Sequence, residues 1–150
     1  MAKHEKSAGV VAYYYDEKNK KPVFLLLKYK TYWGFSKGLM EENEKEEQTA
    51  LRELEEEAEI KAQLIKGFQH KQAWFFKWEN ELVRKEAVYF LARISKEEKE
   101  KTKISFEHED FCWLAYEEAI KKLKIKANKE MLEKANLFIT DFEKQKRLTN

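Results

Sequence analysis

The sequence predicts one α/β domain in which a mixed β-sheet carries helices on both faces. Apolar runs rich in β-branched and aromatic residues dominate the first half of the chain, and helical periodicity appears in the middle and near the end. No internal repeat and no Gly/Ser-rich linker divides the 150 residues, a length that suits a single domain. We therefore expect one domain over residues 1–150.

The predicted strands come from short apolar runs bounded by polar or turn-forming residues. Residues 9–15 and 23–27 flank a polar turn that contains the only proline, and this arrangement is typical of a β-hairpin. We expect four further strands, at residues 60–68, 73–78, 87–94 and 111–114.

The helices are predicted from apolar residues that recur every three or four positions. In residues 46–58 this spacing places Ala50, Leu54 and Ala58 on one stripe. Residues 116–123 and 128–144 show similar patterns, whereas we expect the charged segment 95–103 to be a loop.

The overall composition excludes several classes of protein. The 30 basic and 28 acidic side chains leave a formal net charge of +2, so no uniformly basic surface for DNA is expected. One cysteine excludes an internal disulfide and a cysteine-based zinc cluster. No apolar run approaches the roughly 20 residues of a membrane helix, and the first residues lack a secretory signal, so we expect a cytoplasmic protein without membrane partners.

The helix at residues 46–58 carries an unusual group of carboxylates. At 100° per residue, Glu53, Glu56 and Glu57 fall within an arc of about 100°, beside the apolar stripe rather than opposite it. Two such charges about 5 Å apart repel by roughly 3 kcal/mol at an effective dielectric of 20. A solvated surface helix is one interpretation. A bound divalent cation is the other, and all-oxygen ligands favour Mg²⁺ or Mn²⁺ over zinc.

The spacing around this helix resembles the Nudix box, G-x5-E-x7-R-E-U-x-E-E-x-G-U, over residues 38–60, in which U is a bulky aliphatic residue. Gly38, Glu44 and the segment 52–60 match every specified position except one, because Glu59 stands where the family has glycine. That glycine ends the helix, where a positive φ is often required. Glu59 therefore implies a differently closed helix end or about 1 kcal/mol of strain.

The resemblance implies a Nudix α/β/α sandwich that hydrolyses a nucleoside diphosphate linked to another group. It implies that Arg52 pairs with Glu44 and that Glu57 takes the proton of the attacking water. The same resemblance implies a site for Mg²⁺, which Mn²⁺ can replace. Its ligands are four carboxylates and one backbone carbonyl: Glu53, Glu56, Glu57, Glu107 and the carbonyl of Gly38.

Segments outside the box are similar to the asymmetrical diadenosine tetraphosphate hydrolases. WGFSKG at 33–38 is similar to their WGFPKG stretch, and residues 105–114 resemble their SHEH stretch and the Y-x-W-L that follows it. The resemblance places Lys37 and Lys85 on phosphates and Trp74, or its neighbour Phe75, on the adenine. It also places Tyr89 in the substrate site and Phe142 on the side of the adenine opposite Trp74. We expect His108 to be structural or exposed.

Three functions remain open at this point. The first is Mg²⁺-dependent cleavage of diadenosine tetraphosphate to ATP and AMP. The second is removal of pyrophosphate from the 5′ end of RNA, against which the near-zero net charge weighs mildly. The third is a nucleotide-binding domain without catalysis, although such domains usually lose glutamates of the box and all four are present here.

Overall fold

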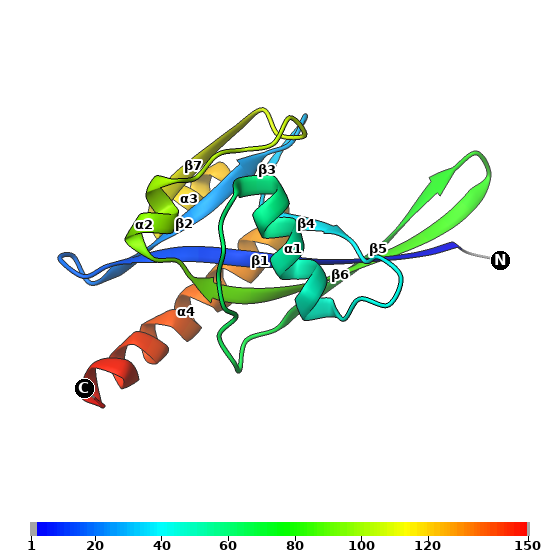
Figure 1. Ribbon diagram of the computed structural model, residues 1–150. Coiled ribbons are helices and arrows are strands. Elements are labelled where there is room, and N and C mark those ends of the chain that lie inside the picture. The colour runs from blue at the N-terminus through cyan, green and yellow to red at the C-terminus, as the bar shows by residue number, and fades with distance from the viewer. Residues whose placement is uncertain (1–2, 150) are drawn as a thin grey trace.

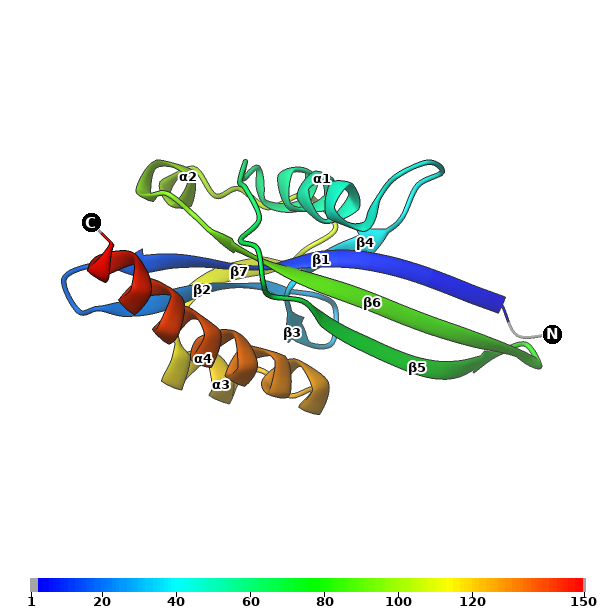
Figure 2. The ribbon, with the colours of Figure 1, turned by 90° about the horizontal axis from the view of Figure 1, so that it is seen from below.

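A mixed β-sheet forms the middle layer, with α1 and α2 on one face and α3 and α4 on the other (Figures 1 and 2). The computed structural model describes residues 3–149. The elements follow one another in the order β1 (Lys3–Asp16), β2 (Lys21–Lys28), β3 (Trp33–Gly34), β4 (Ser36–Leu39), α1 (Glu46–Ala58), β5 (His70–Trp78), β6 (Glu81–Arg93), α2 (Lys96–Glu100), β7 (Asp110–Ala115), α3 (Tyr116–Lys122) and α4 (Lys126–Leu148). The predicted α/β/α arrangement is confirmed.

The seven-stranded sheet has the order β3-β2-β1-β6-β5, while β4 pairs with β1 and β7 pairs with β2. β1 and β6 run parallel with Gly9 opposite Tyr89, and the other pairs are antiparallel. β1 therefore lies at the centre and pairs with three strands. It brings β4, which precedes α1 in sequence, beside the long β5–β6 hairpin.

Two hydrophobic cores lie on opposite faces of this sheet because successive side chains of β1 point to opposite sides. Val11 and Tyr13 pack with the buried face of α4, whereas Val10 and Ala12 belong to the cluster that contains Leu54 of α1. Within residues 3–149, no helix has the length and apolar character that crossing a bilayer demands.

The segment 60–68 corrects one strand prediction. It forms only an isolated bridge, Leu64 to Ala92, instead of a strand. Ile60 is buried in the core on the α1 side and Phe68 in the core on the α4 side. The segment therefore crosses from one face of the sheet to the other, which a strand that pairs within the sheet cannot do.

Two predicted loops also contain regular structure. The segment 95–103 includes the short helix α2, whose first turn is capped by the Ser95 hydroxyl, which accepts a hydrogen bond from the Glu98 N–H. The glycine-containing segment 33–38 forms the short strands β3 and β4.

The β5–β6 hairpin is longer than its predicted strands. Glu79 and Asn80, both at positive φ, form its two-residue turn. With the first half of β1 beside it, the hairpin projects beyond the helices as an arm (Figure 2). The strand residues that were not predicted are 70–72 and 81–86, which are mostly polar and include only one buried apolar side chain, Val83.

Candidate active site

Arg52 connects α1 to the loop that precedes it. Its guanidinium donates to Glu44 at 2.7 and 3.0 Å, to Glu53 at 2.9 Å and to Glu56 at 3.1 Å. A further bond of 3.1 Å goes to the backbone carbonyl of Leu39. The hydrogen bond from Arg52 lowers the pKa of Glu44 to about 2. The expected pairing of Arg52 with Glu44 is therefore present, and it fixes the loop against the helix.

Glu57 is buried at the centre of the site and connects three parts of the chain. Its Oε1 accepts hydrogen bonds from the Ser36 hydroxyl and the Lys37 backbone N–H, both at 3.0 Å. Its Oε2 contacts Nε2 of His108, in the segment before β7. Glu57 thus holds β4, α1 and this segment together.

Gly38 lies directly against the carboxyl group of Glu53. A Cβ atom at Gly38 would stand 2.0–2.4 Å from the three carboxyl atoms of Glu53, a separation that real Cβ contacts do not show. Burial and the charge of Glu57 raise the pKa of Glu53. The absence of a side chain at Gly38 therefore makes room for a partly desolvated carboxylate.

The remaining candidate ligands are more exposed. The Glu56 side chain is 57% exposed and paired with Arg52, and Glu107 is exposed. Among residues 3–149, no three His, Cys, Asp or Glu side chains converge as a ready metal site. The donor chemistry nevertheless suits a hard cation, because carboxylate oxygens and the Gly38 carbonyl are the ligands that Mg²⁺ prefers. Burial first, and then the charge of Glu57, raise the pKa of Glu53, and a nearby cation would oppose both effects.

His108 takes a more central position than the sequence indicated. Its side chain is buried, contacts Glu57 and packs edge-on against Tyr29 with ring centroids 4.6 Å apart. Burial lowers the pKa of His108, but the hydrogen bond and charge of Glu57 outweigh it, and the net shift is upward. Only the place of His108 in the stretch 105–114 could have suggested this role.

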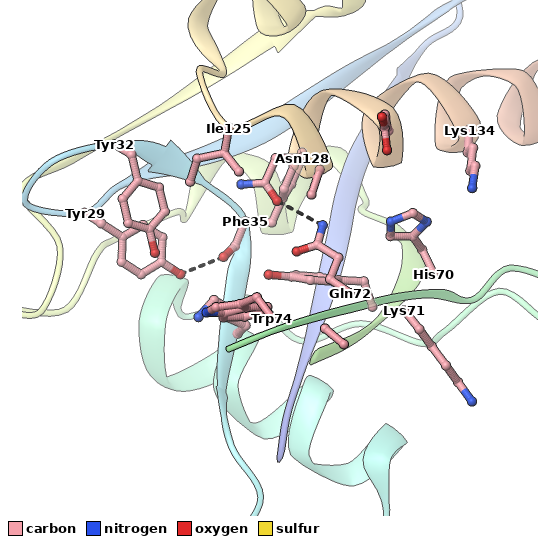
Figure 3. A pocket seen from close by; sticks show the side chains of 15 residues that line it. Tyr29, Tyr32, Phe35, His70, Lys71, Gln72, Trp74, Ile125, Asn128 and Lys134 are labelled. Carbon is pink, nitrogen blue, oxygen red and sulfur yellow. Dashed lines mark hydrogen bonds between the residues drawn. The ribbon is translucent and has the colours of Figure 1, made fainter. Parts of the chain in front are cut away.

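A cleft of about 610 Å³ opens between β5, the loop after β2 and the start of α4 (Figure 3). Lys37 lines it and joins it to Glu57, which accepts the Lys37 backbone N–H. Tyr29 and Tyr32 stack at one side with ring centroids 4.8 Å apart, while Trp74 and the buried Tyr89 also line the cleft. Flat aromatic surfaces of this kind bind nucleobases. Trp74 and Tyr89 were expected from the resemblance to contact the substrate, whereas nothing in the sequence singled out Tyr29 and Tyr32.

Polar groups occupy defined positions in the same cleft. Lys37 lines it with its ammonium group 5.9 Å from the centre of the Trp74 ring, and burial followed by the charge of Lys85 lowers the pKa of Lys37. On the opposite side, the Gln72 side-chain amide donates to Oδ1 of the Asn128 side chain at 3.1 Å (Figure 3). Amide side chains belong to no motif here, so nothing in the sequence pointed to this pair.

Two expected substrate residues do not line the cleft. Lys85 pairs with Glu5 at 3.4 Å and lies over the Phe76 ring. Phe142 stacks on Phe138, with ring centroids 6.1 Å apart, farther along α4. Phe142 therefore does not oppose Trp74 in the structure.

Glu59 ends α1 in the left-handed conformation that the glycine of the box would adopt. Its φ of 56° and ψ of 35° place it there, and its N–H donates to the Glu55 carbonyl at 2.9 Å. The chain thus keeps the usual helix end at a cost of about 1 kcal/mol.

Comparisons with known proteins identify the family and agree with this fold. The NUDIX domain family matches residues 4–135. The asymmetrical bis(5′-nucleosyl)-tetraphosphatase of Sus scrofa is 34% identical over 111 residues, which is 72% of each chain. An Ap4A hydrolase of C. elegans, solved as a binary complex, is 27% identical with a TM-score of 0.78 over 91% of this chain and 98% of its own.

The dihydroneopterin triphosphate pyrophosphohydrolase of E. coli shares the fold, with a TM-score of 0.69 at 23% identity over 88% of this chain and 94% of its own. The chain belongs to the Nudix family. Within that family it is a pyrophosphohydrolase that resembles the asymmetrical tetraphosphatases.

Proposed function

We propose that this enzyme hydrolyses dinucleoside tetraphosphates asymmetrically, releasing ATP and AMP from diadenosine tetraphosphate in the presence of Mg²⁺ or Mn²⁺. The observation that carries the proposal is the junction of two features. The carboxylates of α1 and Gly38 adjoin a cleft that combines aromatic faces with Lys37. The carboxylates suit phosphoanhydride chemistry, and the aromatic cleft suits a nucleoside.

The cleft supplies the contacts for binding. Trp74 or the tyrosine pair would stack on an adenine, and the buried Tyr89 forms part of the wall beneath it. Lys37 lies between this aromatic wall and Glu57, and its ammonium group would contact a phosphate. Lys85 is near enough to depress the pKa of Lys37, so it would add charge at the same edge.

The carboxylates supply the chemistry. Glu53, Glu56, Glu57, Glu107 and the Gly38 carbonyl would hold the metal, which would neutralise phosphate charge and lower the pKa of a bound water. The water oxygen bonds to phosphorus, and the bridging oxygen leaves with the other nucleotide. Glu57 would accept the proton of the water. Arg52 fixes the helix, while His108, Ser36 and the Lys37 N–H orient Glu57.

A panel of substrates tests the proposal. Diadenosine tetraphosphate, 5′-triphosphorylated RNA, NADH, ADP-ribose and oxidised dGTP are each incubated with Mg²⁺, and the products are separated by ion-exchange chromatography. ATP and AMP in equal amounts, formed fastest from the dinucleotide, are expected. A preference for RNA ends would replace this proposal with RNA 5′-pyrophosphohydrolase activity. Binding without any turnover would indicate a nucleotide sensor.

The location of the reaction is a prediction from the sequence. We propose that the enzyme acts on free nucleotides in the cytoplasm and needs no membrane or DNA partner. The near-balance of 30 basic and 28 acidic side chains supports this, because it provides no broad basic surface.

A further inference from the structure

The arm ends the sheet in a strand edge that is open to a partner. β5 pairs with β6, and its other edge meets no strand within residues 3–149 (Figure 2). Most residues of β5 are exposed, including Phe75 at 58% and Trp78 at 63%. An edge with outward N–H and C=O groups can pair with a further strand, and exposed rings of this size mark an interaction surface.

The turn of the hairpin determines which backbone groups face the free edge. Glu79 and Asn80 have φ values of 47° and 65°, as in a type I′ turn, and the residues that flank them are directly opposed. This flanking pair is hydrogen-bonded, and hydrogen-bonded and non-hydrogen-bonded pairs then alternate along the hairpin. The backbone groups of the even-numbered residues of β5 therefore face β6. Those of the odd-numbered residues face the free edge: Lys71, Ala73, Phe75 and Lys77.

The charges along this edge are complementary to a second copy of the same strand. Antiparallel pairing about a two-fold axis at Phe75 places Lys71 of each copy opposite Glu79 of the other, so two opposite-charge pairs form. Moving the axis to Trp74 would instead place Lys71 opposite Lys77, where the like charges repel. The edge thus selects both a partner, a second copy of the chain, and one register.

We propose that two copies of the chain associate through their β5 edges, so that one sheet runs through both arms. In this register Trp74 lies beside Phe76 of the second copy, and Gln72 lies beside Trp78 of the second copy. Opposed residues share a face of the sheet, and Gln72 lines the cleft. Each copy therefore adds an aromatic ring at the edge of the other's cleft.

The shape of the molecule leaves room for this pairing. The arm projects beyond the helices (Figure 2), and in an antiparallel pair the tip of each arm points towards the body of the other copy. The helical layers of the two copies then lie at opposite ends of the shared sheet. The arm has no helix packed over its tip, so its exposed rings would meet rings of the second copy.

Charge reversal tests the partner and the register together. Sedimentation velocity of the full chain at low ionic strength should show a monomer–dimer equilibrium. Lys71→Glu and Glu79→Lys should each weaken the dimer by about tenfold or more, because each turns both opposite-charge pairs into like-charge pairs. An equimolar mixture of the two variants should restore the dimer, since both pairs again join opposite charges in the mixed species.

Lys77→Glu is the matched control, because it makes the same charge change on the same edge but lies opposite Ala73 in this register. It should leave the dissociation constant nearly unchanged. A wild type that stays monomeric up to about 100 μM would overturn the proposal, and so would failure of the mixture to restore the dimer. A tighter dimer of Lys77→Glu would contradict the register. No hydrolysis is measured, so failure to cleave the dinucleotide would refute the proposed function but leave this result intact.

Discussion

The contact between Gly38 and Glu53 leads to the sharpest prediction, for the substitution Gly38→Ala. The added Cβ would lie 2.0, 2.2 and 2.4 Å from the carboxyl carbon and oxygens of Glu53. Real contacts of Cβ atoms stay above 3.0 Å, so the carboxyl group must move by about 1 Å. A misplacement of about 1 Å in a catalytic group can reduce the rate about 100-fold.

The assay is the rate of ATP release from diadenosine tetraphosphate, together with the thermal unfolding midpoint. Gly38→Ala should lose about 100-fold in kcat while its midpoint stays near that of the wild type, because the clash meets the flexible end of a side chain. Leu39→Ala is the control on the same strand, since Leu39 follows Gly38 and its side chain is 54% exposed. Full activity of Gly38→Ala would refute the assignment of Glu53 to the reaction in this position.

Three further substitutions test other parts of the site. Glu57→Gln should reduce kcat by about 100-fold or more, as expected for the loss of a general base. Glu55→Gln, on the exposed side of α1, should leave kcat unchanged. Similar rates for the two variants would show that Glu57 is not the general base. Arg52→Ala should destabilise the protein at neutral pH. The Arg52–Glu44 pair lowers the pKa of Glu44 from 4.5 to about 2 in the folded state, so the stabilisation it provides is present above pH 4.5 and is lost as the pH falls towards 2. The free energies of unfolding in urea of the variant and the wild type should therefore converge near pH 2. A difference that does not depend on pH would contradict the role of the Arg52–Glu44 pair. Glu59→Gly should raise stability by about 1 kcal/mol and the unfolding midpoint by about 2–4 °C, and a lower midpoint would show that the left-handed Glu59 carries no strain.

Local patterns were sufficient to predict much of the fold. The apolar stripe of α1 placed the helix at Glu46–Ala58, as observed, because its residues are spaced to bury one face. The segment 60–68 was predicted wrongly, since its apolar residues serve two different cores and the pattern does not show on which side of the sheet each residue lies. In the β5–β6 arm, residues 73–78 were predicted as a strand, whereas residues 70–72 and 81–86 were missed because they are mostly polar.

In the candidate site too, contacts within one stretch of sequence could be predicted, and contacts made by tertiary packing could not. The resemblance to the box predicted the pairing of Arg52 with Glu44, which are eight positions apart. It did not predict that Gly38 lies against the carboxyl group of Glu53. The contact of His108 with Glu57 joins residues 51 positions apart and carries no motif of its own. Tertiary packing creates such pairs, so a single sequence cannot reveal them.

The identity of the products tests the central claim most directly. Purified protein is incubated with diadenosine tetraphosphate and Mg²⁺, and the nucleotides are identified by chromatography at early times. ATP and AMP in a one-to-one ratio, with no product when the metal ion is chelated, are expected. Two molecules of ADP, or no cleavage at all, would contradict asymmetrical hydrolysis at the site formed by α1 and the cleft.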